Sequence, residues 1–193
     1  MTSSDDSRRS KPDALNYDMR ASLGDALDAW SIVVAHLCSI FAVAVSAQRY
    51  EAAAAAFSSI HDFEDHLKMT DAAMLQSFAS QPDILTQWKA VYRQLKKVQP
   101  LRNKLAHGKL IPIVVEGGGI EWRYLPYFHF YTHKDRDTFL HLTLNDLKKA
   151  ANEIRSSIGS LSRFGRTIGA RQKINAPVRV FESGSSRIVK RPK

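Results

Sequence analysis

A regular apolar stripe in the middle of the chain is the feature that most restricts what it can form. Its positions are spaced by three and four residues, which is the period of one face of an α-helix. They are Ile84, Leu85, Trp88, Val91, Tyr92, Leu95 and Val98. The stripe predicts a helix from about Asp83 to His107, kinked near Pro100 because an internal proline removes a backbone hydrogen bond. Gly108 follows, at the place where helices commonly end in the left-handed conformation.

The next position of this stripe is Arg102, a cation where an apolar side chain is expected. An unpaired buried guanidinium is costly, so Arg102 must form an ion pair, lie at an interface or face a pocket. His107 lies five residues later, roughly 140° around an ideal helix, so the two share a face only if the helix bends or frays. Two interpretations stay open. In one, Arg102 pairs with Glu64 or Asp65 and the histidine merely favours a helix end; in the other, both side chains belong to a functional site.

The chain as a whole is predicted to be mainly α, with a bundle of four to five helices. The first helix, from about Leu23 to Gln48, is apolar nearly all round, which is typical of a central, buried helix. Residues 30–47 contain no Asp, Glu, Lys or Arg, so a membrane span is an alternative. His36 and several serines in this run favour the buried helix, and no membrane span is expected. The second helix is predicted over about Ala52–Phe78.

The last predicted helix covers residues 144–164. Thr143, directly before this helix, and Asp146, in its first turn, have the spacing of a capping box, in which each residue satisfies a backbone N–H of the other. Gly165 and Gly169 are expected to end this helix.

Between the third and last helices, residues 109–143 change to a β pattern and predict an inserted antiparallel β-meander. The expected strands are Lys109–Val115, Ile120–Thr132 and Thr138–Thr143, and the first two are joined by a turn at Glu116–Gly119. The second strand is rich in aromatic residues, which normally indicates a half-buried sheet. Stacking of RNA bases is the alternative use of this strand, through Arg123, His129 and Tyr131.

Positive charge is concentrated at the C-terminus. Residues 163–193 hold nine Lys and Arg against one acid, so they carry +8 of the net charge of +9, and residues 1–162 carry only +1. We therefore predict a disordered polar segment at 1–16, one helical domain at 17–168 and a basic disordered tail at 169–193. The nearly neutral domain means that net charge alone does not indicate nucleic-acid binding.

No metal or cofactor site is expected. The single cysteine, Cys38, provides neither a disulfide framework nor a zinc knuckle, and it favours a reducing, cytoplasmic setting. In the run His61–His66, Asp62 and His66 have the i,i+4 spacing of metal ligands, but a solvated, salt-bridged helix face explains this run as well. We interpret it as such a face.

The stretch Leu101–Gly108, with the sequence LRNKLAHG, resembles the R-x-x-x-x-H motif of the HEPN superfamily. The resemblance includes the polar residue directly after the arginine, and it extends over about residues 20–108 and the last helix. It implies an α-helical bundle that forms a homodimer, in which two motifs face one cleft. Lys109 stands where toxins silenced by AMP transfer carry a tyrosine, so the resemblance does not extend to that group.

This resemblance implies a metal-independent endoribonuclease, toxin-like or involved in phage defence, that cleaves RNA by attack of a ribose 2′-hydroxyl. His107 would be the general acid and base, Arg102 would hold the phosphate, and Asn103 would orient the phosphate or the histidine. RNA and a protein inhibitor or antitoxin are the expected partners. The alternative is a non-catalytic HEPN-like module that binds a protein or a nucleotide through the same surface.

Overall fold

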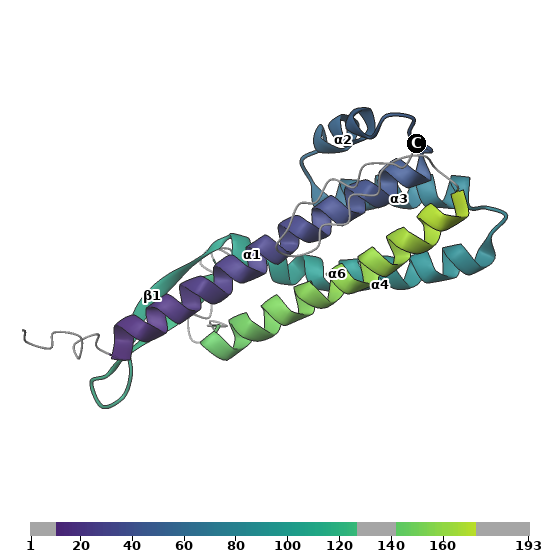
Figure 1. Cartoon of the computed structure of the whole chain (residues 1–193). Helices are drawn as coiled ribbons and strands as arrows, with labels where there is room; N and C mark the ends of the chain where they lie inside the picture. The colour runs from purple at the N-terminus through teal and green to yellow at the C-terminus, as the bar shows by residue number, and fades with distance from the viewer. Residues whose placement is uncertain (1–10, 127–141, 173–193) are drawn as a thin grey trace, which may run out of the picture. The chain divides into compact units, whose positions relative to one another are not determined.

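The computed structural model describes residues 11–126 and 142–172. This part of the chain is mainly helical with one small antiparallel sheet (Figure 1). Its elements are α1 (Lys11–Ala44), α2 (Tyr50–Ser58), α3 (Phe63–Ser77), α4 (Pro82–Ala106), β1 (Gly108–Val114), β2 (Ile120–Pro126) and α6 (Leu144–Gln172). The prediction of a mainly α protein is confirmed, and of the predicted antiparallel β-meander the described residues contain a sheet of two strands.

The chain divides into two compact units. The first unit contains Met1–Trp30 and Val98–Arg155, and the second contains Ser31–Lys97 and Ser156–Lys193. Helices α1, α4 and α6 therefore contribute residues to both. Buried apolar side chains of the first unit include Met19, Ala26, Trp30, Leu105, Tyr124, Leu125, Leu147 and Ile154. Those of the second unit include Leu37, Phe57, Leu67, Met74, Phe78, Trp88, Leu95, Leu161, Phe164 and Ile168.

Helix α1 begins earlier than predicted. It starts at Lys11, so the prediction of disorder up to residue 16 is wrong for residues 11–16, while residues 1–10 lie outside the described part. Pro12 lies in the first turn, where its missing N–H would have had no helical partner and its fixed φ suits a helix. By length and apolar composition α1 could span a membrane, but 56% of its apolar window is buried in the protein.

The second predicted helix is two helices, α2 and α3. The chain leaves the helical conformation after Ser59, and Asp62 begins α3 as its N-cap. The Asp62 carboxylate accepts the backbone N–H of Glu64 at 2.7 Å, which satisfies one donor of the first turn. Asp62 was interpreted as part of a continuous helical face, so its capping role is a correction.

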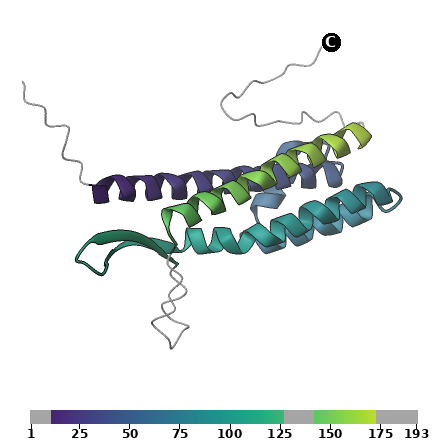
Figure 2. The same cartoon turned by 90° about the horizontal axis from the view of Figure 1, so that it is seen from below.

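Helix α4 confirms the apolar stripe. Ile84, Trp88 and Leu95 are fully buried in the second unit, and the helix continues through Pro100 to Ala106. In this unit α3 and α4 lie side by side (Figure 2), and the indole N–H of Trp88 donates to Asp71 on α3 at 2.7 Å.

Helix α6 begins as predicted but ends later. Thr143 and Asp146 form the capping box: Asp146 accepts the Thr143 N–H at 2.9 Å, and the Thr143 hydroxyl accepts the Asp146 N–H at 3.3 Å. The helix then runs through Gly165 and Gly169 to Gln172. Glycine disfavours helices only weakly, and burial of Phe164 and Ile168 outweighs that preference. The predicted tail is thus helical at 169–172, and 173–193 lie outside the described part.

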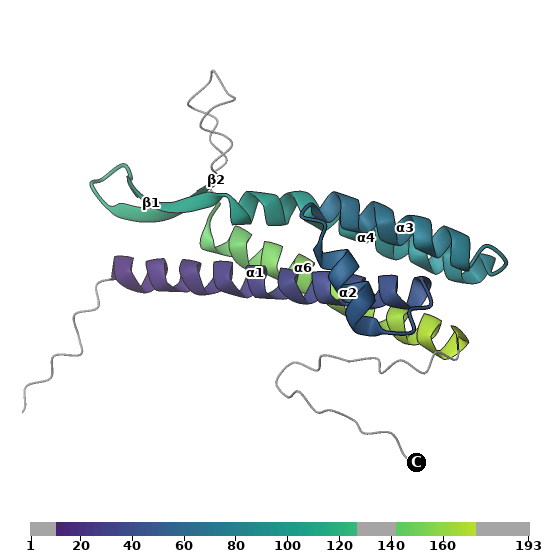
Figure 3. The same cartoon turned by 90° about the horizontal axis from the view of Figure 1, so that it is seen from above.

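Strands β1 and β2 form a hairpin with a register from Gly108↔Pro126 to Val114↔Ile120. The predicted turn is confirmed, because Val115 N–H bonds to the Gly119 carbonyl and both Gly117 and Gly118 have positive φ. In the first unit the hairpin extends along the N-terminal part of α1 (Figure 3). Of the third predicted strand, only residues 142–143 are described, and Leu142 forms a bridge with Tyr124.

We predict that His36 makes the protein less stable in acid. His36 is buried in the second unit, and burial, followed by the nearby cation of Arg166, lowers its pKa below the usual 6.5. Below pH 6.5 the unfolded chain therefore binds more protons than the folded protein. The free energy of unfolding should fall as the pH drops below 6.5 and level off below the folded-state pKa.

Urea unfolding of the wild type and of His36→Gln at about pH 7.5 and about pH 5 measures this effect. The wild type should lose more stability between the two pH values than the variant does. The exposed His61 provides the control, since His61→Gln should lose as much as the wild type. Equal losses in all three proteins would show that His36 does not contribute.

Candidate functional site

Arg102 occupies the last position of the apolar stripe and belongs to the first unit. Among the described residues, no carboxylate forms an ion pair with it. Its side chain is half-buried, and its guanidinium carbon lies 5.8 Å from the centroid of the buried Trp30 ring, a cation–π distance. One terminal nitrogen, Nη1, donates to the Asn103 side-chain oxygen at 3.2 Å. The Nε atom is buried and has no hydrogen-bond partner. The guanidinium is thus held by an aromatic ring and an amide, both neutral.

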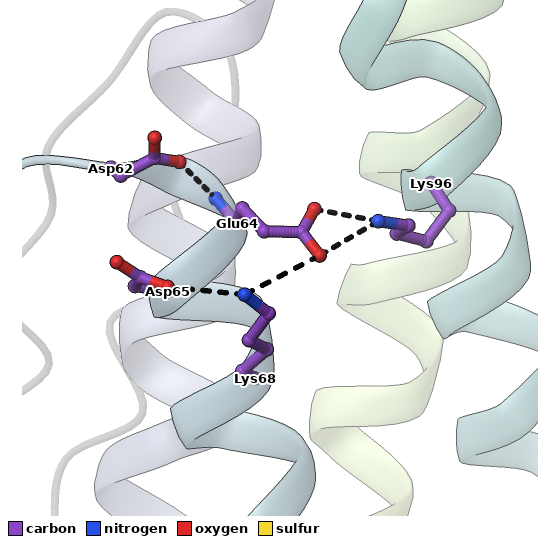
Figure 4. Close-up of polar contacts among 5 residues, drawn as sticks. All are labelled: Asp62, Glu64, Asp65, Lys68 and Lys96. Carbon is purple, nitrogen blue, oxygen red and sulfur yellow. Dashed lines mark hydrogen bonds and ion pairs between the residues drawn. The ribbon is translucent and has the colours of Figure 1, made fainter.

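The two carboxylates suggested as partners of Arg102 form other ion pairs. Both Glu64 oxygens accept from the Lys96 ammonium, at 2.8 and 2.6 Å (Figure 4). Asp65 pairs with Lys68 at 3.4 Å, on the exposed surface of α3. The hypothesis of a structural ion pair between Arg102, which belongs to the first unit, and either of these acids of the second unit stays a prediction. These acids instead connect α3 to α4 and to the next turn of α3 within the second unit.

His107 is the single residue between the last residue of α4 and the first residue of β1, and its side chain is exposed. The buried Tyr124 on β2 holds the backbone on both sides of it. The Tyr124 hydroxyl donates to the Leu105 carbonyl and accepts the Gly108 N–H, the latter at 3.0 Å. Burial raises the pKa of Tyr124, so its hydroxyl keeps the proton that it donates. The position of His107 therefore depends on a hydrogen-bond bridge from the hairpin.

Gly108 has a different role from the predicted one. Among the described glycines, positive φ occurs at Gly117 and Gly118, so Gly108 does not end α4 in the left-handed conformation. It begins β1, where a Cβ atom would collide with the Tyr124 ring and lie 2.7 Å from the Leu125 carbonyl oxygen. Glycine is required here because the tyrosine bridge brings β2 close to the backbone of β1.

The cluster His61–His66 is structural. His61 is exposed, Asp62 caps α3, and the buried His66 turns into the second unit. There the His66 ring stacks on Phe57 at 4.0 Å between centroids, and its Nε2 lies 2.8 Å from the Phe57 carbonyl. Asp62 and His66, which have metal-ligand spacing in the sequence, thus have separate roles. In the described ranges 11–126 and 142–172 no group of three or more His, Cys, Asp or Glu could hold a metal ion.

Of the three residues predicted from the sequence, the structure brings Arg102 and Asn103 into contact and places His107 at the junction of α4 and β1. Sequence reasoning missed Trp30 and Tyr124. Tyr124 was visible only as one member of an alternating aromatic pattern, and Trp30 as one apolar residue among many in α1. Neither pattern indicates which polar group the aromatic side chain will contact.

This arrangement provides two chemical capabilities. A half-buried guanidinium without a carboxylate can bind an oxyanion, because charge-assisted hydrogen bonds to such anions are strong and arginine matches them geometrically. An imidazole is the side chain most often used as a general acid and base in catalysis. Arg102 lies near the C-terminal end of α4, and His107 directly follows the helix at its junction to β1.

No model of a known protein family, no characterised protein and no solved structure matches this chain.

We predict that Tyr124→Phe destabilises the protein and loosens the backbone around His107. The change removes one hydroxyl and leaves the Leu105 carbonyl and the Gly108 N–H unpaired, at a cost of about 1–3 kcal/mol per buried group. Urea unfolding measures the stability, and amide hydrogen exchange at Gly108 measures the local effect.

Tyr92→Phe is the matched control. Tyr92 is half-buried on α4, where its ring makes an edge contact with Trp88 at 6.2 Å between centroids. Loss of its hydroxyl should change stability by less than about 0.5 kcal/mol. If Tyr124→Phe behaved like this control and Gly108 exchanged at the wild-type rate, the bridge would not hold the junction.

Proposed function

We propose that this protein is a metal-independent endoribonuclease of the HEPN type with a toxin-like or defence role. The proposed active site consists of Arg102, Asn103 and His107. The observation that supports this proposal most is the Arg102 guanidinium, which has no carboxylate partner in the described part of the chain. A cation paired for stability would be neutralised by an acid. Arg102 instead keeps its charge available for a phosphate, which guanidinium binds in a bidentate manner.

In the proposed reaction, the ribose 2′-oxygen attacks the adjacent phosphorus. A bond forms between O2′ and phosphorus, and the bond from phosphorus to O5′ breaks. The products are a 2′,3′-cyclic phosphate and a 5′-hydroxyl. Proton transfer requires a base that takes the 2′-hydroxyl proton and an acid that protonates the leaving oxygen. The exposed imidazole of His107 supplies these transfers.

Arg102 stabilises the negative charge that develops on the phosphate oxygens during this attack. Asn103 contacts the guanidinium, so its role in the proposal is to orient Arg102. Tyr124 is a positioning residue, because it fixes the backbone on both sides of His107 and does not itself touch the reacting atoms. The bridge thus limits the positions from which the imidazole can approach the phosphate.

The remaining features of the proposal come from the resemblance alone. They are a homodimer in which two motifs share one cleft, a protein inhibitor or antitoxin as partner, and a cytoplasmic location. Sedimentation of the purified chain tests the dimer, for which the proposal predicts a mass twice that of the 21.7 kDa chain. These expectations do not alter the chemistry assigned to the three site residues.

We predict that the purified protein cleaves single-stranded RNA in the presence of EDTA, and that His107→Ala slows cleavage at least about 100-fold. This size is typical of the loss of one general acid–base group. His107 is exposed, so the variant should fold normally. Gel analysis of an end-labelled RNA measures the rate, and mass spectrometry should identify the cyclic phosphate.

His61→Ala is the matched control, because His61 is also exposed but belongs to the second unit and is not one of the proposed site residues. It should cleave at the wild-type rate. An oligonucleotide with 2′-deoxyribose at every position should remain intact, since it lacks the nucleophile. Absence of cleavage by the wild type, or equal cleavage by His107→Ala, would reject the ribonuclease and favour the non-catalytic module.

A further inference from the structure

An open groove of about 490 Å³ lies in the first unit between α1 and β1. Its volume is within the range of small-molecule sites. The lining residues are Arg20, Leu23, Gly24 and Leu27 from α1, Gly108, Lys109 and Leu110 from β1, and Tyr124 from β2. Both charged residues are cations, one on each wall, and the leucines are apolar. The groove therefore complements a ligand that carries negative charge and an apolar part.

Gly24 is the residue of this groove whose presence the fold does not explain. It lies in the interior of α1, where glycine is the least favourable residue except proline. Its φ is not positive, and a Cβ atom built on it meets nothing within 4 Å. Gly108, by contrast, is required by the Tyr124 ring. Packing and backbone conformation thus do not require glycine at position 24, and the missing side chain leaves the groove open at this point.

Two residues of the groove directly follow the proposed site in the sequence, although Arg102, Asn103 and His107 do not line the groove. Gly108 and Lys109 line it and directly follow His107 in the chain. Gly108 is part of the same bridge that holds the His107 backbone. A ligand lying along β1 in the groove would therefore extend to the start of β1, which follows His107 in the chain.

We propose that this groove binds an unpaired nucleotide of a single-stranded RNA, adjacent to the phosphate that is cleaved. This inference rests on the proposed ribonuclease function. In this proposal a phosphate of the RNA backbone interacts with the two cations of the groove, Arg20 and Lys109. The base packs on the apolar side chains of Leu23, Leu27 and Leu110, in the space left open by Gly24. A base can enter an apolar groove only when it is not paired, so the groove selects single strands over duplexes. The Nε of Arg20 donates to Asn16 at 2.7 Å, which orients its guanidinium.

Gly24→Leu tests the proposal, because it fills the groove without disturbing the fold. Leucine favours helices more than glycine does, so the melting temperature should rise by a few degrees. Affinity for a labelled, single-stranded 2′-O-methyl RNA, which has no free nucleophile, should fall at least about fivefold in fluorescence anisotropy. Stability and binding thus change in opposite directions, which misfolding cannot produce.

Gly159→Leu is the matched control. Gly159 is likewise inside a helix, a Cβ on it also meets nothing within 4 Å, and it lies in the second unit. This variant should gain stability and bind RNA as the wild type does. Arg20→Gln is a second test that does not depend on filling the groove, and it should lower the slope of log affinity against log salt by about one.

The outcomes separate this inference from the proposed function. If Gly24→Leu and Arg20→Gln bind the 2′-O-methyl RNA as the wild type does, the groove proposal is overturned, whether or not ordinary RNA is cleaved. If both variants bind more weakly but the wild type cleaves no RNA, the groove proposal holds and the ribonuclease fails. Equal binding of a duplex of the same sequence would also overturn the groove proposal.

Discussion

The hydrogen-bond bridge made by Tyr124 is the interaction on which the arrangement of the first unit depends. One buried hydroxyl joins the Leu105 carbonyl, in the last turn of α4, to the Gly108 N–H, at the start of β1. A helix end normally leaves carbonyl groups unsatisfied, and here a side chain from the hairpin satisfies one of them. For this bridge to form, the Tyr124 ring must lie so close to the backbone of residue 108 that no side chain fits there. The bridge therefore requires glycine at position 108.

Arg102 occupies a position that is unfavourable for the fold, and the proposed function gives a reason for its charge. Its buried Nε lacks a partner, which costs about 1–3 kcal/mol, and the contact with Trp30 returns about 0.5–2 kcal/mol. The two contributions have opposite signs and similar sizes, so the guanidinium is expected to contribute little net stability to the first unit. A phosphate would supply the charge and the acceptor oxygens that the free protein lacks at this position.

The sequence predicted the features that depend on local pattern. The stripe of α4, the capping box at Thr143 and Asp146, and the glycine turn at residues 116–119 follow from periodicity, side-chain spacing and backbone preference. One error arose where tertiary contacts decide. Burial of Phe164 and Ile168 carries α6 past two glycines. The error at Asp62 was local: the break between α2 and α3 was missed, so its role as the cap of α3 was missed too. Arg102 and Asn103 could be selected from a motif, but the contacts of Trp30 and Tyr124 require the folded register.

The central claim is that Arg102 is retained for an anion and not for an internal ion pair. Urea unfolding of Arg102→Met, which keeps the side-chain length and can still pack on Trp30, tests this claim most directly. Removing the guanidinium should change the free energy of unfolding by no more than about 1 kcal/mol, or increase it, because an unpaired donor is removed with it. A loss of about 3–5 kcal/mol, typical of breaking a buried ion pair, would contradict the account.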